Sequence, residues 1–120
     1  MRIIVSVAAL TLSTLAYAQQ PTFNVPALER DCASLVAETR VPAKAEVVLP
    51  LKGLPPSIEA LHPRRVSVDK EGVHISLQPS GTHASELFYL PERSVVSDSW
   101  VVAHGFTRVG DRLYTSNHDG

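Results

Sequence analysis

The chain has 120 residues, 44% of them hydrophobic, and a formal net charge of −1. That length suits one domain, and the hydrophobic content favours a folded core over intrinsic disorder. Because basic and acidic residues nearly balance, the charge gives no reason to expect binding to nucleic acid or to an anionic membrane surface.

The first eighteen residues have the pattern of a secretory signal peptide. Arg2 gives a positive start, an apolar run follows from Ile3 to Leu15, and Ala16-Tyr17-Ala18 is a small-x-small cleavage site. The apolar run is shorter than the roughly 20 residues of a membrane-spanning helix, so an uncleaved anchor is the less favoured alternative. We therefore predict a single domain over residues 19–120, periplasmic or secreted, with no stable membrane insertion after cleavage.

A helix is expected from about Ala27 to Arg40. Pro26 suits its first turn, where the missing N–H costs nothing, and Pro42 prevents continuation. The single cysteine, Cys32, lies in the middle of the apolar stripe, so we predict a core side chain rather than a nucleophile or an intermolecular disulfide. Without an intramolecular disulfide, burial alone has to hold the domain together. The apolar stripe consists of Leu28, Cys32, Leu35 and Val36.

Prolines divide the middle of the chain. A short strand is predicted over Glu46–Leu49, and a short helix opens at Pro55-Pro56 and ends at Pro63. The segment Pro79–Ser85 is polar and turn-rich, which is typical of a loop. Glu86–Leu90 is then predicted as a strand.

The clearest local structure is a β-hairpin over Arg65–Gln78. Apolar residues alternate with polar ones on both sides of the turn Asp69-Lys70-Glu71-Gly72, which predicts one buried and one solvated face. Asp at the first turn position and Gly at the last favour a type I turn with a positive φ at Gly72. The register that buries both apolar rows pairs Val68 with Val73 and Val66 with Ile75.

A second hairpin is predicted near the C-terminus, with strands over Trp100–Val109 and Leu113–Ser116. A two-residue loop would pair Arg108 with Leu113, and a three-residue loop would pair Val109 with Leu113. The second register is preferred because it brings two apolar residues together. Residues 116–120 are expected to form a frayed polar tail.

These elements predict an α+β fold, in which an N-terminal helix and one short helix pack on a four- to five-stranded, mainly antiparallel sheet. The short links between strands favour antiparallel pairs, since parallel pairs need long crossovers. No internal repeat or long linker divides the chain.

No motif for catalysis or for a cofactor stands out. The histidines have none of the spacings typical of zinc sites, and no GxSxG elbow, P-loop or GxGxxG is present. We therefore expect no cofactor and no resident metal, and we assign no catalytic residue. The histidines are His62, His74, His83, His104 and His118.

The candidate for function is a surface. Arg65 and His74 belong to the polar face of the predicted hairpin, and Ser80, Thr82 and His83 belong to the adjoining loop. A small polar loop supported by a sheet is the kind of element that binding proteins use. The competing interpretation is an ordinary solvated face.

The favoured hypothesis is a non-enzymatic, inhibitor-like or immunity-like module that binds an unknown envelope or extracellular protein. One alternative is a small hydrolase or metal-dependent enzyme, which would need a cleft with two of His74, His83 and His104 near an acid. Another is a structural homodimer joined through Cys32 or an exposed edge strand.

Overall fold

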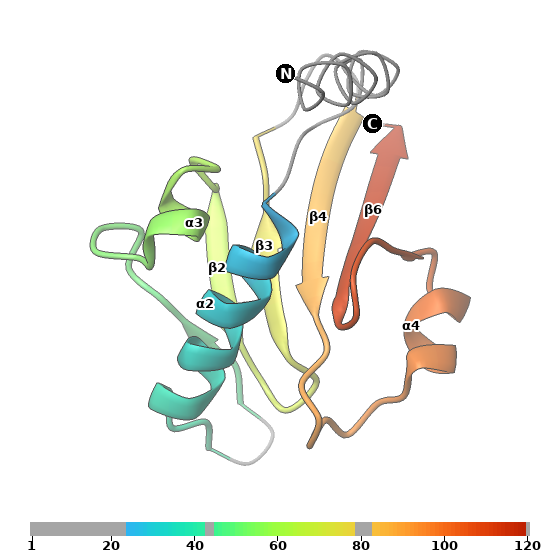
Figure 1. The fold of residues 1–120 in the computed structure, drawn as a ribbon, viewed down its shortest axis with the longest axis horizontal. Coiled ribbons are helices and arrows are strands. Elements are labelled where there is room, and N and C mark those ends of the chain that lie inside the picture. Colours follow the sequence, from blue (N-terminus) through green and yellow to red (C-terminus); the bar gives the residue numbers. More distant parts are fainter. Residues whose placement is uncertain (1–23, 43–44, 79–82, 120) are drawn as a thin grey trace, which may run out of the picture.

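A computed structural model of the protein describes residues 24–42, 45–78 and 83–119. For residues 83, 84 and 117–119 it describes the backbone only. The predicted signal peptide and residues 79–82 of the predicted loop lie outside these ranges. In the described part, helices pack against a single open antiparallel sheet (Figure 1).

The sheet has the strand order β1-β2-β3-β4-β6-β5, and every neighbouring pair is antiparallel. This confirms the predicted α+β class, with six strands among the described residues where four to five were expected. The outermost strands, β1 and β5, have two residues each. The elements are α2 (Val25–Glu38), β1 (Val47–Val48), α3 (Pro56–Glu59), β2 (Arg65–Val68), β3 (Val73–Ser76), β4 (His83–Tyr89), α4 (Asp98–Ala103), β5 (Thr107–Arg108) and β6 (Leu113–Asp119).

β2 and β3 form the predicted hairpin in the predicted register, with Val68 opposite Val73 and Val66 opposite Ile75. All four side chains are buried on the face of the sheet that we call the first face. Burying apolar side chains of this size contributes about 1.5–3 kcal/mol each. The hairpin therefore supplies the sheet side of the main core, against which α2 and α3 pack.

α2 begins and ends two residues earlier than predicted, at Val25 and Glu38. Asn24 sets the start, because its side-chain oxygen accepts a hydrogen bond from the Ala27 N–H at 3.3 Å. Asparagine is among the preferred N-cap residues for this reason. The end follows from Thr39, whose backbone is extended. The predicted stripe is confirmed: Leu28, Cys32 and Leu35 are buried, and Val36 packs against them.

Ser57 joins α3 to α2. Its Oγ donates a hydrogen bond to Asp31 Oδ2 at 2.6 Å, and its N–H donates to the same oxygen at 3.1 Å. Burial acts to raise the pKa of Asp31, but these hydrogen bonds, with help from Arg30, bring it below its ordinary value. The stabilisation is therefore present above the ordinary pKa of an aspartate and is lost as pH falls through the lowered pKa.

The segment predicted as a strand over Trp100–Val109 instead begins as a helix. α4 covers Asp98–Ala103, and the strand is limited to β5. Ser97 is the N-cap, because its Oγ accepts a hydrogen bond from the Trp100 N–H at 3.2 Å. This bond satisfies one of the N–H groups that the first turn of a helix leaves without a partner.

α4 ends in a Schellman motif. The Gly105 N–H donates to the Val102 carbonyl at 3.1 Å, and the Phe106 N–H donates to the Val101 carbonyl at 3.4 Å. Gly105 has a φ of 92°, in the left-handed region that glycine adopts without a Cβ penalty. Phe106 packs against the cluster of side chains that includes Val101, which is the apolar contact that accompanies this motif.

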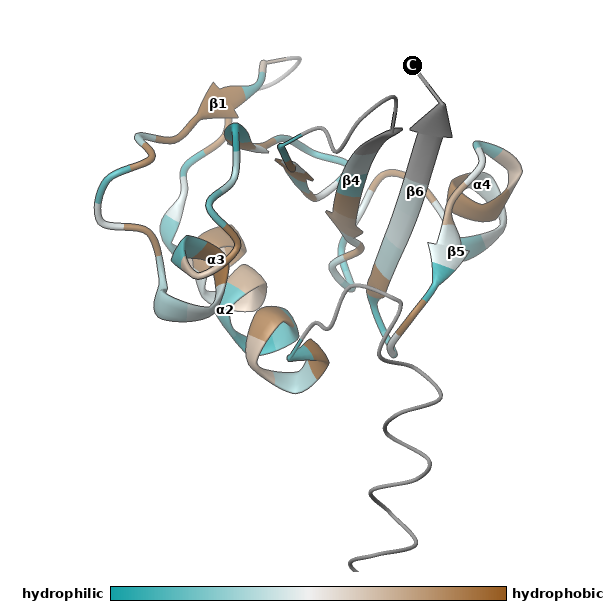
Figure 2. Cartoon of the chain, turned by 90° about the horizontal axis from the view of Figure 1, so that it is seen from above, coloured by the Kyte–Doolittle hydropathy of each residue, from teal (hydrophilic) through white to brown (hydrophobic). Residues whose placement is uncertain are grey.

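α4 covers part of the second face of the sheet, which carries Phe88 and Tyr114. Val101 of α4 is buried against these two rings. The Tyr114 hydroxyl donates a hydrogen bond to Asp98 in the first turn of α4. Burial, followed by this bond, raises the pKa of Tyr114 to about 12, so the hydroxyl remains a donor at neutral pH. Figure 2 shows α2 and α3 on one side of the sheet and α4 on the other.

The register of the second hairpin is the predicted one. Arg108 lies opposite Tyr114, and the Val109 N–H donates to the Leu113 carbonyl at 2.8 Å. The loop therefore has three residues. Val109 itself is exposed, so an apolar contact between Val109 and a buried Leu113 is not the reason for this register.

β4 and β6 are both longer than predicted. β4 begins at His83, within the predicted loop, and β6 continues to Asp119, where a frayed tail was expected. These two ends pair with each other, His83 opposite Asp119. Each supplies the other with backbone partners, a long-range contact that neither local sequence reveals.

Gly72, at the end of the hairpin turn, has a φ of 156°. A Cβ at this position would lie 2.1 Å from the carbonyl oxygen of Tyr89. Because that oxygen belongs to the backbone, a side-chain rotation cannot relieve the overlap. We predict that Gly72→Ala lowers the free energy of unfolding by about 3 kcal/mol or more, measured by urea denaturation.

Gly53→Ala is the matched control for this prediction. Gly53 has a φ of 84°, yet a Cβ there would meet no atom within 4 Å. Backbone strain alone costs about 1–2 kcal/mol in that region. Equal losses in the two variants would contradict the steric explanation.

Candidate functional site

The second face of the hairpin is more enclosed than the predicted solvated face. Ser67 is 1% exposed, and the side chain of His74 is 22% exposed. The His74 ring lies with its centroid 5.0 Å from that of Phe88, its neighbour across the β3–β4 pair. The side chain of Glu46, just before β1, accepts a hydrogen bond from Ser67. The polar groups at this place are therefore held in position rather than freely solvated.

Asp69 is fixed by the turn that closes the hairpin. Its Oδ1 accepts hydrogen bonds from the N–H groups of Glu71 at 2.8 Å and of Gly72 at 3.1 Å. The Nε2 atom of His74 lies 3.1 Å from each carboxylate oxygen of Asp69. It also lies 3.7 Å from Oε1 of Glu71. Two carboxylates and an imidazole therefore converge at this end of the hairpin.

Glu46 adds a third carboxylate from just before β1. Its Oε1 lies 2.6 Å from a guanidinium nitrogen of Arg65, and its Oε2 accepts a hydrogen bond from Ser67 Oγ at 2.9 Å. The hydrogen bond from Ser67, followed by that from Arg65, lowers the pKa of Glu46. Donors that favour the charged form of a carboxyl group have this effect, so Glu46 is ionised at neutral pH.

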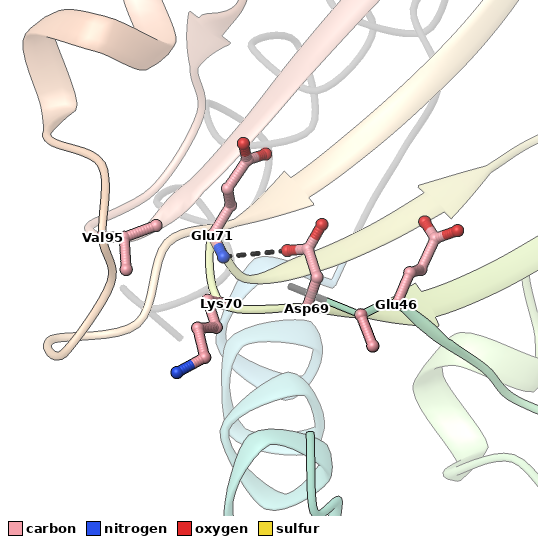
Figure 3. A pocket seen from close by; sticks show the side chains of 6 residues that line it. Glu46, Asp69, Lys70, Glu71 and Val95 are labelled. Atoms are coloured by element: carbon pink, nitrogen blue, oxygen red, sulfur yellow. Dashed lines mark hydrogen bonds between the residues drawn. The ribbon is translucent and has the colours of Figure 1, made fainter. Parts of the chain in front are cut away.

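The three carboxylates border an open hollow of about 330 Å³, which we call the acidic hollow. Figure 3 shows the carboxylates of Glu46, Asp69 and Glu71 on the same side, while the ammonium group of Lys70 points away. Among the described residues, Arg65 is the one permanent cation paired with a member of this group. Since the whole chain has a formal charge of −1, the excess of carboxylates is local. The residues that line the hollow are Ala45, Glu46, Asp69, Lys70, Glu71 and Val95.

Asp69, Glu71 and His74 have the spacing of possible metal ligands. Each offers one ligand atom, and these atoms lie within 4.8 Å of one another. However, Oδ1 of Asp69 already accepts two backbone hydrogen bonds, and both of its oxygens contact His74 Nε2. An imidazole nitrogen that donates its N–H to a carboxylate has no lone pair for a metal. The geometry therefore favours a bond that stabilises the turn over metal coordination.

Two of the five predicted binding residues belong to this site. His74 contacts Asp69, and Arg65 pairs with Glu46, as described above. Ser80 and Thr82 lie outside the described residues. His83 is the first residue of β4, and its side chain is not among those described.

The sequence prediction missed the acidic side chains, Glu46, Asp69 and Glu71. Asp69 and Glu71 were assigned to the turn, where acids usually serve local hydrogen bonds, and Asp69 does so here. Glu46 was expected at the start of a strand, but the partner of that strand was unknown. The pairing of β1 with β2, Val47 opposite Val68, is what brings Glu46 beside the turn.

His104 does not join His74. Its ring stacks on Trp100 with the centroids 3.9 Å apart, and its Nδ1 lies 2.7 Å from the Trp100 carbonyl oxygen. Among the described side chains, the one group with metal-ligand spacing contains a single histidine. The cleft with two histidines that would favour an enzyme is not formed by these side chains.

The chain matches no protein family model, and comparison with curated proteins and with solved structures gives no significant match. Within the described ranges, no helix is both long enough and apolar enough to cross a membrane. α2, with 14 residues, carries a buried stripe on one side and exposed residues on the other.

Cys32 is fully buried, and burial, with smaller contributions from Asp31 and Glu29, raises the pKa of its thiol to about 12. The thiolate is the reactive form of cysteine. We predict that iodoacetamide labels the folded protein at least about 100-fold more slowly than the urea-unfolded chain at mildly alkaline pH. Fast labelling of the folded protein would contradict the core assignment and support the disulfide-linked homodimer.

The network around Glu46 predicts a measurable titration. In the wild type we expect Glu46 to titrate below the ordinary glutamate value of about 4.3, followed by carbon-13 NMR of its carboxyl group. Ser67→Ala and Arg65→Gln should each raise this pKa, because each removes a donor to the carboxylate. Ser76→Ala is the control, since Ser76 faces Arg65 across the hairpin without bonding Glu46. A wild-type Glu46 that titrates at the ordinary value would contradict the network.

Proposed function

We propose that the protein is a non-enzymatic binding module, exported to the envelope or beyond, that recognises a partner protein through the acidic hollow. The partner places a lysine or arginine side chain among Glu46, Asp69 and Glu71. One observation carries this proposal: three carboxylates lie on the same side of an open hollow in a chain that is otherwise nearly neutral (Figure 3).

The surroundings of the carboxylates suit this role. Opposite charges about 4 Å apart attract each other by about 1 kcal/mol in bulk water. At the lower effective dielectric constant typical near a protein surface, the attraction is about 4 kcal/mol. Glu46 is held by Arg65 and Ser67, and Asp69 is held by the turn, so both are preorganised. Preorganised groups lose little side-chain entropy on binding, and complementary charge adds specificity and a faster association rate.

The two alternatives have less support. The enzyme hypothesis needs two histidines near an acid, and the described side chains bring one histidine, His74, to Asp69 and Glu71. The homodimer hypothesis needs a reactive cysteine or a long free edge. Cys32 is buried, which counts against the disulfide-linked form. In the described sheet β5 pairs only with Tyr114 and Thr115, so an edge-paired dimer would have to use the part of β6 beyond Thr115.

The test is a titration of nitrogen-15-labelled protein with a hexa-arginine peptide at low ionic strength. We predict shifts of the backbone amide signals of residues 69–74 and of Glu46. Glu71→Gln should weaken binding about 3- to 10-fold, because it removes one charge and leaves the main-chain hydrogen bonds of the turn in place.

Glu59→Gln is the matched control, since Glu59 is exposed on α3 and does not line the hollow. Its affinity for hexa-arginine should equal that of the wild type. Hexa-glutamate, the second control, should produce no shifts at residues 69–74. Equal weakening in the Glu71 and Glu59 variants would mean that the peptide responds only to the net charge of the protein. The proposal would then be wrong.

A further inference from the structure

The acidic hollow is the first of three adjoining hollows around this end of the molecule. A second hollow of about 300 Å³ shares Asp69, Lys70 and Val95 with it. A third, of about 280 Å³, shares Val36, Pro91 and Arg93 with the second. Because neighbouring hollows share lining residues, the three form a row. The row runs from the hairpin turn past residues 91–95 to the exposed side of α2.

The chemistry changes along this row. Three carboxylates border the first hollow. Lys70 and Arg93 line the second, both are exposed, and no carboxylate of the described residues forms an ion pair with either. The third is bordered by the apolar or small side chains of Ala33, Val36, Ala37, Tyr89 and Pro91, together with the charged residues Glu92 and Arg93. Carboxylates therefore predominate in the first hollow, cations outnumber the one carboxylate, Asp69, in the second, and apolar groups predominate in the third.

A ridge between the first two hollows is held by backbone hydrogen bonds. The Val95 N–H donates to the Lys70 carbonyl at 3.1 Å, and Ser94 Oγ donates to the Glu71 carbonyl at 2.6 Å. The segment after β4 is thereby tied to the hairpin turn. Val95 remains 66% exposed, and it lines both hollows. A rigid backbone that presents an exposed apolar side chain between charged groups is typical of an interaction surface.

Resting on the function proposed above, we infer that this row binds an extended segment of the partner protein. The segment carries a cationic, an anionic and an apolar side chain in that order. The cation enters the acidic hollow, the anion meets Lys70 and Arg93, and the apolar side chain packs against Val36 and Pro91. In an extended chain every second side chain faces the same way, so the three residues stand at positions i, i+2 and i+4.

Charge complementarity is the reason for this choice of occupant. A free divalent cation would use the first hollow alone and would leave Lys70 and Arg93 without partners. A uniformly basic segment would bring its later charges against the same two cations, and like charges in contact oppose binding. A segment of alternating charge with an apolar end satisfies all three hollows.

The experiment uses fluorescent pentapeptides with serine as the spacer. Arg-Ser-Glu-Ser-Leu and its reverse, Leu-Ser-Glu-Ser-Arg, present the inferred order in the two chain directions. One of them should bind at least about tenfold more tightly than Glu-Ser-Arg-Ser-Leu, in which the charges are exchanged. Equal affinity of the ordered and exchanged peptides would overturn the inference.

Two variants locate the bound peptide. Arg93→Glu should weaken the ordered peptide, and the peptide with arginine in place of its glutamate should recover the lost affinity in this variant. Val95→Ser should also weaken binding, whereas Val102→Ser, an equally mild change at an exposed valine of α4, should not. Loss without recovery in Arg93→Glu, or equal loss in both valine variants, would contradict the assigned contacts.

The hexa-arginine titration separates failure of this inference from failure of the proposed function. One outcome is that hexa-arginine binds at residues 69–74 while the ordered peptides bind no better than the exchanged one. In that case the acidic hollow is a binding site, and the inference that the whole row binds an extended segment is wrong. If neither kind of peptide binds there, both are wrong. If Ca²⁺ or Zn²⁺ alone shifts the same signals and displaces the peptide, the first hollow is a metal site and the inference is again overturned.

Discussion

The close packing at the turn of the hairpin is the constraint on which the rest of the structure depends. Gly72 lies directly beneath the carbonyl oxygen of Tyr89, and any side chain at that position would separate β3 from the end of β4. Within the turn, the Asp69 carboxylate accepts a hydrogen bond from the Glu71 N–H. From the segment that follows β4, Ser94 Oγ donates a hydrogen bond to the Glu71 carbonyl. The same few atoms therefore set the register that buries the main core and the position of the carboxylates at its edge. The same turn therefore contributes to the stability of the fold and to the geometry of the candidate site.

The second face of the sheet is divided between two environments. α4 covers the part with Phe88 and Tyr114, and the hydrogen bond from Tyr114 to Asp98 fixes the first turn of the helix there. α4 has only six residues, so its cover is limited, and the polar groups around Ser67 lie beyond it. Ser67 is buried nonetheless, and Glu46 accepts the hydrogen bond of its hydroxyl group. A buried hydroxyl without a partner would cost about 1–3 kcal/mol, so this bond is required by the packing as well as useful to the site.

Local sequence patterns predicted what depends on local periodicity. The hairpin, its register and the apolar stripe of α2 follow from side chains within a few residues of one another. α4 was mistaken for a strand because Trp100, Val101 and Val102 suit either structure. Ser97 and Gly105 were the available signals, an N-cap and a left-handed C-terminal glycine. The acidic hollow could not be predicted, since Glu46 and Asp69 meet only after β1 pairs with β2.

The acidic hollow also has an energetic consequence for the free protein. Three carboxylates at one place repel one another, and the described groups that offset this are Arg65, Ser67, His74 and the N–H groups of the turn. Glu71 receives the least of this support, since its one described partner is His74 at 3.7 Å. A cation from a partner would relieve the remaining repulsion and would favour the folded state by mass action. The turn that carries this repulsion is also the turn that aligns the core, so a cation bound in the hollow should stabilise the hairpin as well.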